Sequence, residues 1–109
     1  MDFDAALALL LHDFAQAESS QQTTALQVLT DFLPPSSPQH KPCSEADLHD
    51  LLDAATDCFI AAQDEDTQVA LAALIRNAAA YVGALPRQDI RLCTHLQAQP
   101  DDVWHGYFR

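Results

Sequence analysis

The sequence predicts an all-α fold of four to five helices, arranged as two antiparallel helical hairpins followed by a short C-terminal helix. Apolar residues recur at helical spacing along the chain, whereas the alternation typical of strands does not recur. Glycine occurs only twice, and the prolines lie between the periodic segments. The 109 residues are 49% hydrophobic and 19% charged, which is typical of one globular domain over 1–109.

The first hairpin is predicted over residues 2–33. Its first helix starts near Asp2 or Asp4, and its second helix takes Ser19 or Ser20 as N-cap. The expected buried stripes are Phe3, Leu7, Leu10, Leu11 and Phe14 in the first helix and Ala25, Leu26, Leu29, Phe32 and Leu33 in the second. Two consecutive prolines end the second helix, and residues 34–43 form a proline-rich loop.

The second hairpin is predicted over residues 44–85. Ser44 to Asp47 resembles a capping box with Asp in place of Glu, so a helix starts there. A break is expected at 64–67, and Gly83 with Pro86 ends the following helix. The expected buried stripes are Leu48, Leu51, Leu52, Ala55, Phe59 and Ala62 in the first helix and Leu71, Leu74, Ile75, Ala78, Val82 and Leu85 in the second.

A short C-terminal helix is predicted over 87–99, with Ile90, Cys93 and either Leu96 or Gln97 on its apolar side. Beyond Pro100 lies an aromatic tail, 100–109, in which Trp104, Tyr107 and Phe108 have the spacing of one helical turn. We expect these aromatic side chains to dock on the core, because exposed apolar patches are a liability. The alternatives are a contact with a partner, including a homodimer, and a chain that continues in a longer protein.

The two hairpins are related by a shift of forty-five residues, which superimposes apolar positions without an insertion. The shift pairs Leu7 with Leu52, Phe14 with Phe59, Ala17 with Ala62, Ala25 with Ala70, Leu26 with Leu71 and Leu29 with Leu74. Two amphipathic hairpins rich in Ala and Leu can share such a pattern by chance. A true helical repeat is the other interpretation, since periods of ~40–47 residues are typical of HEAT and armadillo arrays.

The segment from Ala72 to Ala79 resembles the last helix of an armadillo repeat, which is a small apolar run with a buried asparagine at the position of Asn77. The resemblance covers Ser44–Leu85. The first half departs from it, because Phe32 stands at the position equivalent to Asn77. The resemblance implies a binding scaffold without catalysis. The alternative is a polar residue at the edge of an amphipathic helix.

Acidic residues dominate the charge: sixteen Asp and Glu against five Lys and Arg give a net charge of −11. Such a chain is repelled by phosphate backbones and anionic lipid, so we expect neither direct nucleic-acid binding nor membrane binding. A protein partner with a basic surface fits better, although solubility alone also explains the charge. The candidate partner-binding residues are Asp47, Asp50, Asp53, Asp57, Asp64, Glu65 and Asp66, with Trp104, Tyr107 and Phe108 of the tail.

The sequence predicts no catalytic, cofactor-binding or metal site. Two glycines are too few for a glycine-rich phosphate loop. A zinc site formed by His40, Cys43, Cys93 and His95 is disfavoured, because residues at i and i+2 of a helix diverge. Cys58 is a poor nucleophile, since the neighbouring Asp57 disfavours its thiolate. The odd number of cysteines favours a reducing, cytoplasmic setting, and the acidic start of the chain is unlike a signal peptide.

These observations predict a small acidic protein–protein interaction module, an adaptor or regulator that is not an enzyme. The alternative is an acidic inhibitor of a nucleic-acid-binding protein, as in anti-CRISPR, anti-restriction or nuclease-immunity proteins. Eight of the sixteen acidic residues lie in 45–66, which suits an inhibitory face. A secretion chaperone is a further alternative. We expect Asp50, Asp53 and Asp57 to form a solvated face whose conversion to Asn leaves stability nearly unchanged.

Overall fold

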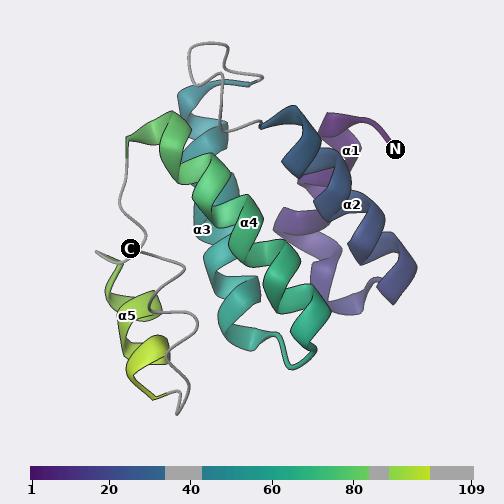
Figure 1. The fold of residues 1–109 in the computed structure, drawn as a ribbon. Coiled ribbons are helices and arrows are strands. Elements are labelled where there is room, and N and C mark those ends of the chain that lie inside the picture. The colour runs from purple at the N-terminus through teal and green to yellow at the C-terminus, as the bar shows by residue number, and fades with distance from the viewer. Residues whose placement is uncertain (34–42, 84–88, 99–109) are drawn as a thin grey trace.

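The computed structural model describes residues 1–33, 43–83 and 89–98, which form an all-α fold (Figure 1). These residues hold α1 (Phe3–Ala8), α2 (Ser19–Phe32), α3 (Glu45–Ala61), α4 (Glu65–Val82) and α5 (Ile90–Gln97), and no strand. The predicted fold class is confirmed, because α1 packs on α2, α3 packs on α4, and α5 is the short C-terminal helix. Within the described ranges, every helix is too short or too polar to span a lipid bilayer.

The first hairpin is less regular than its periodicity predicts. Asp2 caps α1, since its Oδ1 accepts a hydrogen bond from the Ala5 amide at 2.8 Å. The helix then widens into a π-helical turn, η1 (Leu9–Asp13), and tightens into a 3-10 turn, η2 (Phe14–Gln16). The prediction that Ser19 or Ser20 caps α2 is wrong: the N-cap is Glu18, whose side chain makes no capping bond.

The second hairpin follows its capping signals closely. Ser44 Oγ accepts a hydrogen bond from the Asp47 amide at 3.2 Å, as the capping box predicts. The break predicted at 64–67 lies slightly earlier, at Ala62–Asp64, and Asp64 caps α4 by accepting from the Thr67 amide at 3.0 Å. At the end of α4, Gly83 takes the left-handed conformation with φ of 70°. A left-handed residue is a common helix terminator, and glycine adopts it without steric cost.

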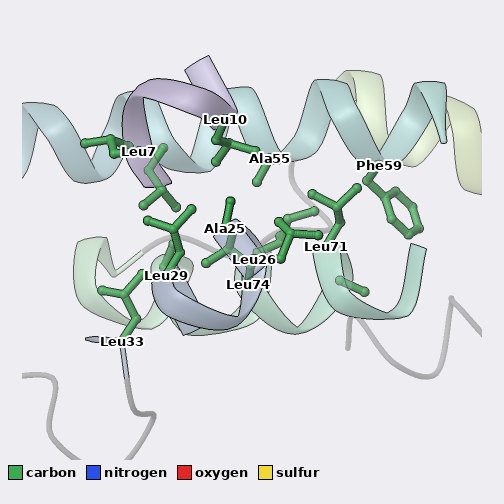
Figure 2. Packing of buried hydrophobic residues seen from close by; sticks show 14 of the residues in the cluster. Leu7, Leu10, Ala25, Leu26, Leu29, Leu33, Ala55, Phe59, Leu71 and Leu74 are labelled. Atoms are coloured by element: carbon green, nitrogen blue, oxygen red, sulfur yellow. The ribbon is translucent and has the colours of Figure 1, made fainter. Parts of the chain in front are cut away.

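The core lies where the two hairpins meet (Figure 2). Side chains of α1, η1, α2, α3 and α4 converge there, and Figure 2 shows Leu29 of α2 and Leu74 of α4 among them. Most of the predicted stripes are buried, whereas Leu11, Leu52, Ala62 and Val82 are half-buried against the same core. The fully buried large residues are Leu26, Leu29, Leu33, Leu48, Leu51, Phe59, Leu71, Leu74, Ile75 and Leu92.

Two residues expected in the core are exposed instead. Phe32 is 50% exposed, although its ring packs edge-on against the Phe3 ring at 5.3 Å between centroids. Ile90 is 81% exposed, because α5 buries Leu92 together with Leu96, one of the two predicted alternatives, while Cys93 is half-buried. The helix also starts later than predicted, since Asp89 has an extended conformation as its N-cap.

Some predictions fall outside the described residues. The proline-rich loop, apart from Cys43, and the terminator Pro86 lie there, as does Leu85. The aromatic tail, with Trp104, Tyr107 and Phe108, also lies outside them. Docking of the tail on the core therefore stays a prediction.

Leu74→Ala should lower the free energy of unfolding by about 2–5 kcal/mol, because it removes a fully buried side chain between the hairpins. Val69→Ala on the same helix is the matched control, since Val69 is 49% exposed and its truncation should cost less than about 1 kcal/mol. Chemical denaturation measures both changes. Equal losses for the two variants would contradict the helix orientation.

Candidate functional site

One arginine binds much of the acidic face of α3. Arg91 Nη1 donates to Asp57 Oδ1 at 2.5 Å, and Nη2 donates to Asp53 Oδ1 at the same distance. Nη2 also contacts Asp89 Oδ2 at 3.1 Å. Asp53 and Asp57 lie one turn apart on α3, so a single guanidinium fork reaches both carboxylates.

Apolar contacts accompany this bridge. Leu92 and Leu96 are buried on the side of α5 that faces the core. The His95 ring packs edge-on against the ring of the buried Phe59 at 5.8 Å between centroids. Since an isolated helix of eight residues is marginal in water, α5 depends on these contacts with α3.

Asp89 links the bridge to the start of α5. Its Oδ1 accepts from the Arg91 amide at 2.9 Å and the Leu92 amide at 3.3 Å, so it caps the helix while its carboxylate faces the guanidinium. Burial raises the pKa of Asp89, but hydrogen bonds from Arg91 and from the Leu92 amide outweigh burial and hold that pKa below its ordinary value. The side-chain hydrogen bonds from Arg91 to Asp89 and Asp53 in turn raise the pKa of Arg91.

Asp50, Asp53 and Asp57 are all exposed, as a solvated face requires, and Asp53 and Asp57 also bind Arg91. Exposed ion pairs contribute only about 0–1 kcal/mol each, because water screens them. We therefore expect conversion of Asp53 and Asp57 to Asn to weaken the attachment of α5 to α3 at a small cost in stability.

The remaining acidic candidates lie at helix starts. Glu45 and Asp47 occupy the first turn of α3, and Glu65 and Asp66 occupy the first turn of α4. Asp64 is the N-cap of α4, and its Oδ2 also accepts from Thr67 Oγ1 at 3.1 Å. Negative side chains stabilise the positive end of a helix dipole, so part of this charge concentration serves the two helices.

Two open hollows adjoin on the surface beside α3. The larger, about 470 Å³, lies where η2, α2 and the α3–α4 turn meet, and these segments share one end of the bundle (Figure 1). The smaller, about 290 Å³, lies between η1 and α3. Asp57 and Cys58 line both hollows, so together they form one elongated surface, here termed the α3 groove.

The lining of the larger hollow has an apolar part, here termed the floor, and a polar part, here termed the rim. Phe14 and Ala15 of η2 face Cys58, Ala61 and Ala62 at the end of α3. The polar lining residues are Gln22, Gln63, Thr67, Asp57 and Asp64.

Two glutamine side chains brace the walls. Gln22 Nε2 donates to the Phe14 carbonyl at 2.6 Å and ties α2 to η2, while Gln68 Nε2 donates to the Ala62 carbonyl at 2.9 Å. Both bonds satisfy carbonyl groups at the ends of helical segments, which fixes the local backbone.

The α3 groove is acidic. Asp50, Asp53, Asp57 and Asp64 are among its described lining residues, none of which is basic, while Arg91 of α5 pairs with Asp53 and Asp57. At the floor, burial and the neighbouring Asp57 raise the pKa of the Cys58 thiol. The groove therefore offers apolar contact and negative charge rather than a nucleophile.

The residues of the disfavoured zinc site do not form a cluster in the part of the chain that the structure describes. His40 lies outside the described residues, while Cys93 and His95 are half-buried on α5. Within the ranges 1–33, 43–83 and 89–98, no group of three or more His, Cys, Asp or Glu side chains is arranged to hold a metal ion.

No protein-family model, curated protein or solved structure matches the chain. The armadillo and HEAT resemblance therefore stays a prediction. Asn77 is half-buried on α4, and the paired positions Leu26 with Leu71 and Leu29 with Leu74 are all buried. Phe14 and Phe59 are also both buried, but Phe14 lies in a 3-10 turn and Phe59 in an α-helix.

Arg91→Gln should loosen α5, because it removes the donor that joins Asp53, Asp57 and Asp89. We expect amide hydrogen exchange in α5 to become roughly 2–5-fold faster, as an exposed network worth about 0.5–1 kcal/mol implies. Amides of α4 serve as the internal reference. Arg91→Lys keeps the positive charge but loses the forked guanidinium, so its α5 exchange rate should lie between those of wild type and Arg91→Gln. Unchanged α5 exchange in Arg91→Gln would refute this attachment.

Acid should also release α5. The pKa of folded Asp89 lies below the ordinary value of 3.8, so its ionised form adds stability above that pH. This stability is lost as the pH falls through the folded pKa. The methyl resonances of Leu92 and Leu96, followed by NMR from about pH 6 to about pH 2, should shift below about pH 4. Asp89→Asn keeps an oxygen for the cap but removes this titration, so its acid-induced shift should be smaller.

Proposed function

We propose that the chain is a small, non-catalytic protein-interaction module that binds a basic segment of a partner protein along the α3 groove. The observation that carries the proposal is the groove itself, which joins an apolar floor to carboxylates of α3 and the α4 cap. Apolar contact supplies affinity in such interfaces, and complementary charge supplies orientation and association rate.

The Arg91 bridge supports the basic character of the partner. Asp53 and Asp57 are spaced so that one guanidinium binds both, which is an intramolecular example of the recognition proposed for the partner. Asp50, one turn before Asp53 on the same helix, extends the acidic row beyond the bridge. A partner Lys or Arg can therefore add to this row without displacing Arg91.

A second candidate is inhibition of a nucleic-acid-binding protein by occupation of its basic surface. The observation that favours it is the exposure of all eight acidic residues in 45–66, on two helices that pack together. In that case the partner's own DNA or RNA competes with the chain for the same surface. Competition by a duplex oligonucleotide in the binding measurement separates this candidate from an adaptor that leaves nucleic-acid binding intact.

Asp50→Asn tests the charge requirement without touching the Arg91 bridge. A partner captured from cells of the source organism and purified should bind this variant about 2–10-fold more weakly at low salt, as one rim charge implies. Raising salt from about 50 to about 300 mM should weaken wild-type binding strongly, and the variant less.

Asp31→Asn is the matched control, because it removes one exposed charge from the end of α2, away from the groove. It should bind as wild type does. A complex insensitive to salt and to Asp50→Asn would exclude a basic partner at this face.

A further inference from the structure

We infer that the larger hollow of the α3 groove receives one apolar side chain of the partner's basic segment, with Asp57 and Asp64 binding Lys or Arg residues on either side of it. This inference rests on the proposed function and deepens it, since it names the residue pattern that the groove selects. Three features of the groove support it: the apolar floor, the charged rim and the extent of the groove along α3.

The floor fits an apolar anchor. Phe14, Cys58 and Ala62 contribute carbon and sulfur atoms to the lining of a hollow of about 470 Å³, within the range of ~300–1,000 Å³ typical of ligand sites. Small side chains at positions 15, 61 and 62 leave this space between η2 and the end of α3. Binding energy at protein interfaces concentrates in one or a few such buried anchors.

The rim supplies charge on two sides of the anchor. Asp57 lies on α3 and Asp64 caps α4, and both line the larger hollow. A carboxylate has two oxygens and about four acceptor sites, so the bonds from Arg91 to Asp57 and from Thr67 to Asp64 do not exhaust either group. Basic residues flanking the anchor are therefore favoured over acidic ones.

The extent of the groove favours a polypeptide over a small molecule. The smaller hollow continues from Asp57 and Cys58 along η1 and α3, past Asp53 to Asp50. An extended or helical segment can occupy both hollows and contact several carboxylates. A small amine binds only one carboxylate and leaves most of the groove unoccupied.

Charge also disfavours a second copy of the chain and its segment 99–109 as occupants. A second copy carries the same net charge of −11 and the same acidic groove. The segment 99–109 has Asp101 and Asp102 against a single Arg109, so it lacks the basic excess that the rim selects. A basic segment of another protein is the complementary occupant.

Selection from a displayed library of random dodecapeptides on the full chain tests the inference. We expect enriched peptides to carry a Leu, Ile, Phe or Trp residue with Lys or Arg within a few positions on both sides. Binding should fall at least about tenfold for Ala61→Phe, which fills the hollow from an exposed position. Ala46→Phe, at an exposed site in the first turn of the same helix, should bind as wild type does.

Alkylation of Cys58 gives an independent readout. A bound peptide should slow its modification, measured by mass spectrometry, relative to Cys43, which is also half-buried but lies outside the groove lining. Equal protection of both cysteines would contradict occupation of the larger hollow.

The results separate the inference from the proposed function. Basic peptides that lose affinity in Asp50→Asn but bind Ala61→Phe normally would overturn the inference and leave the proposed function standing. Enrichment of neutral or acidic peptides, or of none, would overturn both. The single Trp104 reports on the tail: a change in its indole resonance in Ala61→Phe, but not in Ala46→Phe, would assign the hollow to 99–109 instead. A dimer in sedimentation that Ala61→Phe disrupts would assign it to a second copy.

Discussion

The burial of α4 between α2 and α3 is the constraint on which the rest of the structure depends. It packs against α3 within its own hairpin and against α2 of the first hairpin, and its buried face is wide enough for both neighbours. Leu71 and Leu74 fill the interior, while the small side chains of Ala72 and Ala79 allow a neighbouring helix to approach closely. Because α2 and α3 are both held by α4, the end of α3 faces η2, and that juxtaposition creates the hollow.

Much of the fold could be predicted because local signals and burial agree in the hairpins. Two helix starts are marked by side-chain hydrogen bonds, from the Asp47 amide to Ser44 and from the Thr67 amide to Asp64. The end of α4 is marked by the positive φ of Gly83. These signals depend only on neighbouring residues. In a long helix the apolar period repeats over several turns, so the buried stripes of α3 and α4 could be predicted from the sequence. The π-helical turn η1 has no comparable local signal, and it packs against α2 and α3, which are distant in the sequence.

The sequence could not predict the buried face of α5 or the bridge at the acidic face, and the two omissions have one cause. A helix of eight residues offers two apolar pairs at helical spacing, Ile90 with Cys93 and Leu92 with Leu96, and periodicity cannot choose between them. The buried pair is determined by contacts with Phe59, Asp53 and Asp57, which lie more than thirty positions away in the chain. Charge counting located the acidic residues correctly, but it could not show that a distant arginine binds two of them, nor that they border a hollow.

The π-helical turn Leu9–Asp13 has a consequence for how this protein tolerates changes in length. Such a turn is an α-helix with one residue inserted, so removal of any one of its five residues restores regular winding. The wide turn accommodates the extra residue, so this removal leaves Phe14, which lies immediately beyond, at the same position around the helix axis and in contact with the interior and the hollow. Removal of a residue from the regular helix α1 instead turns everything beyond it by about 100° around the axis, which carries Phe14 away from both. Natural variants of this chain should therefore lose a single residue within the π-helical turn far more readily than within α1.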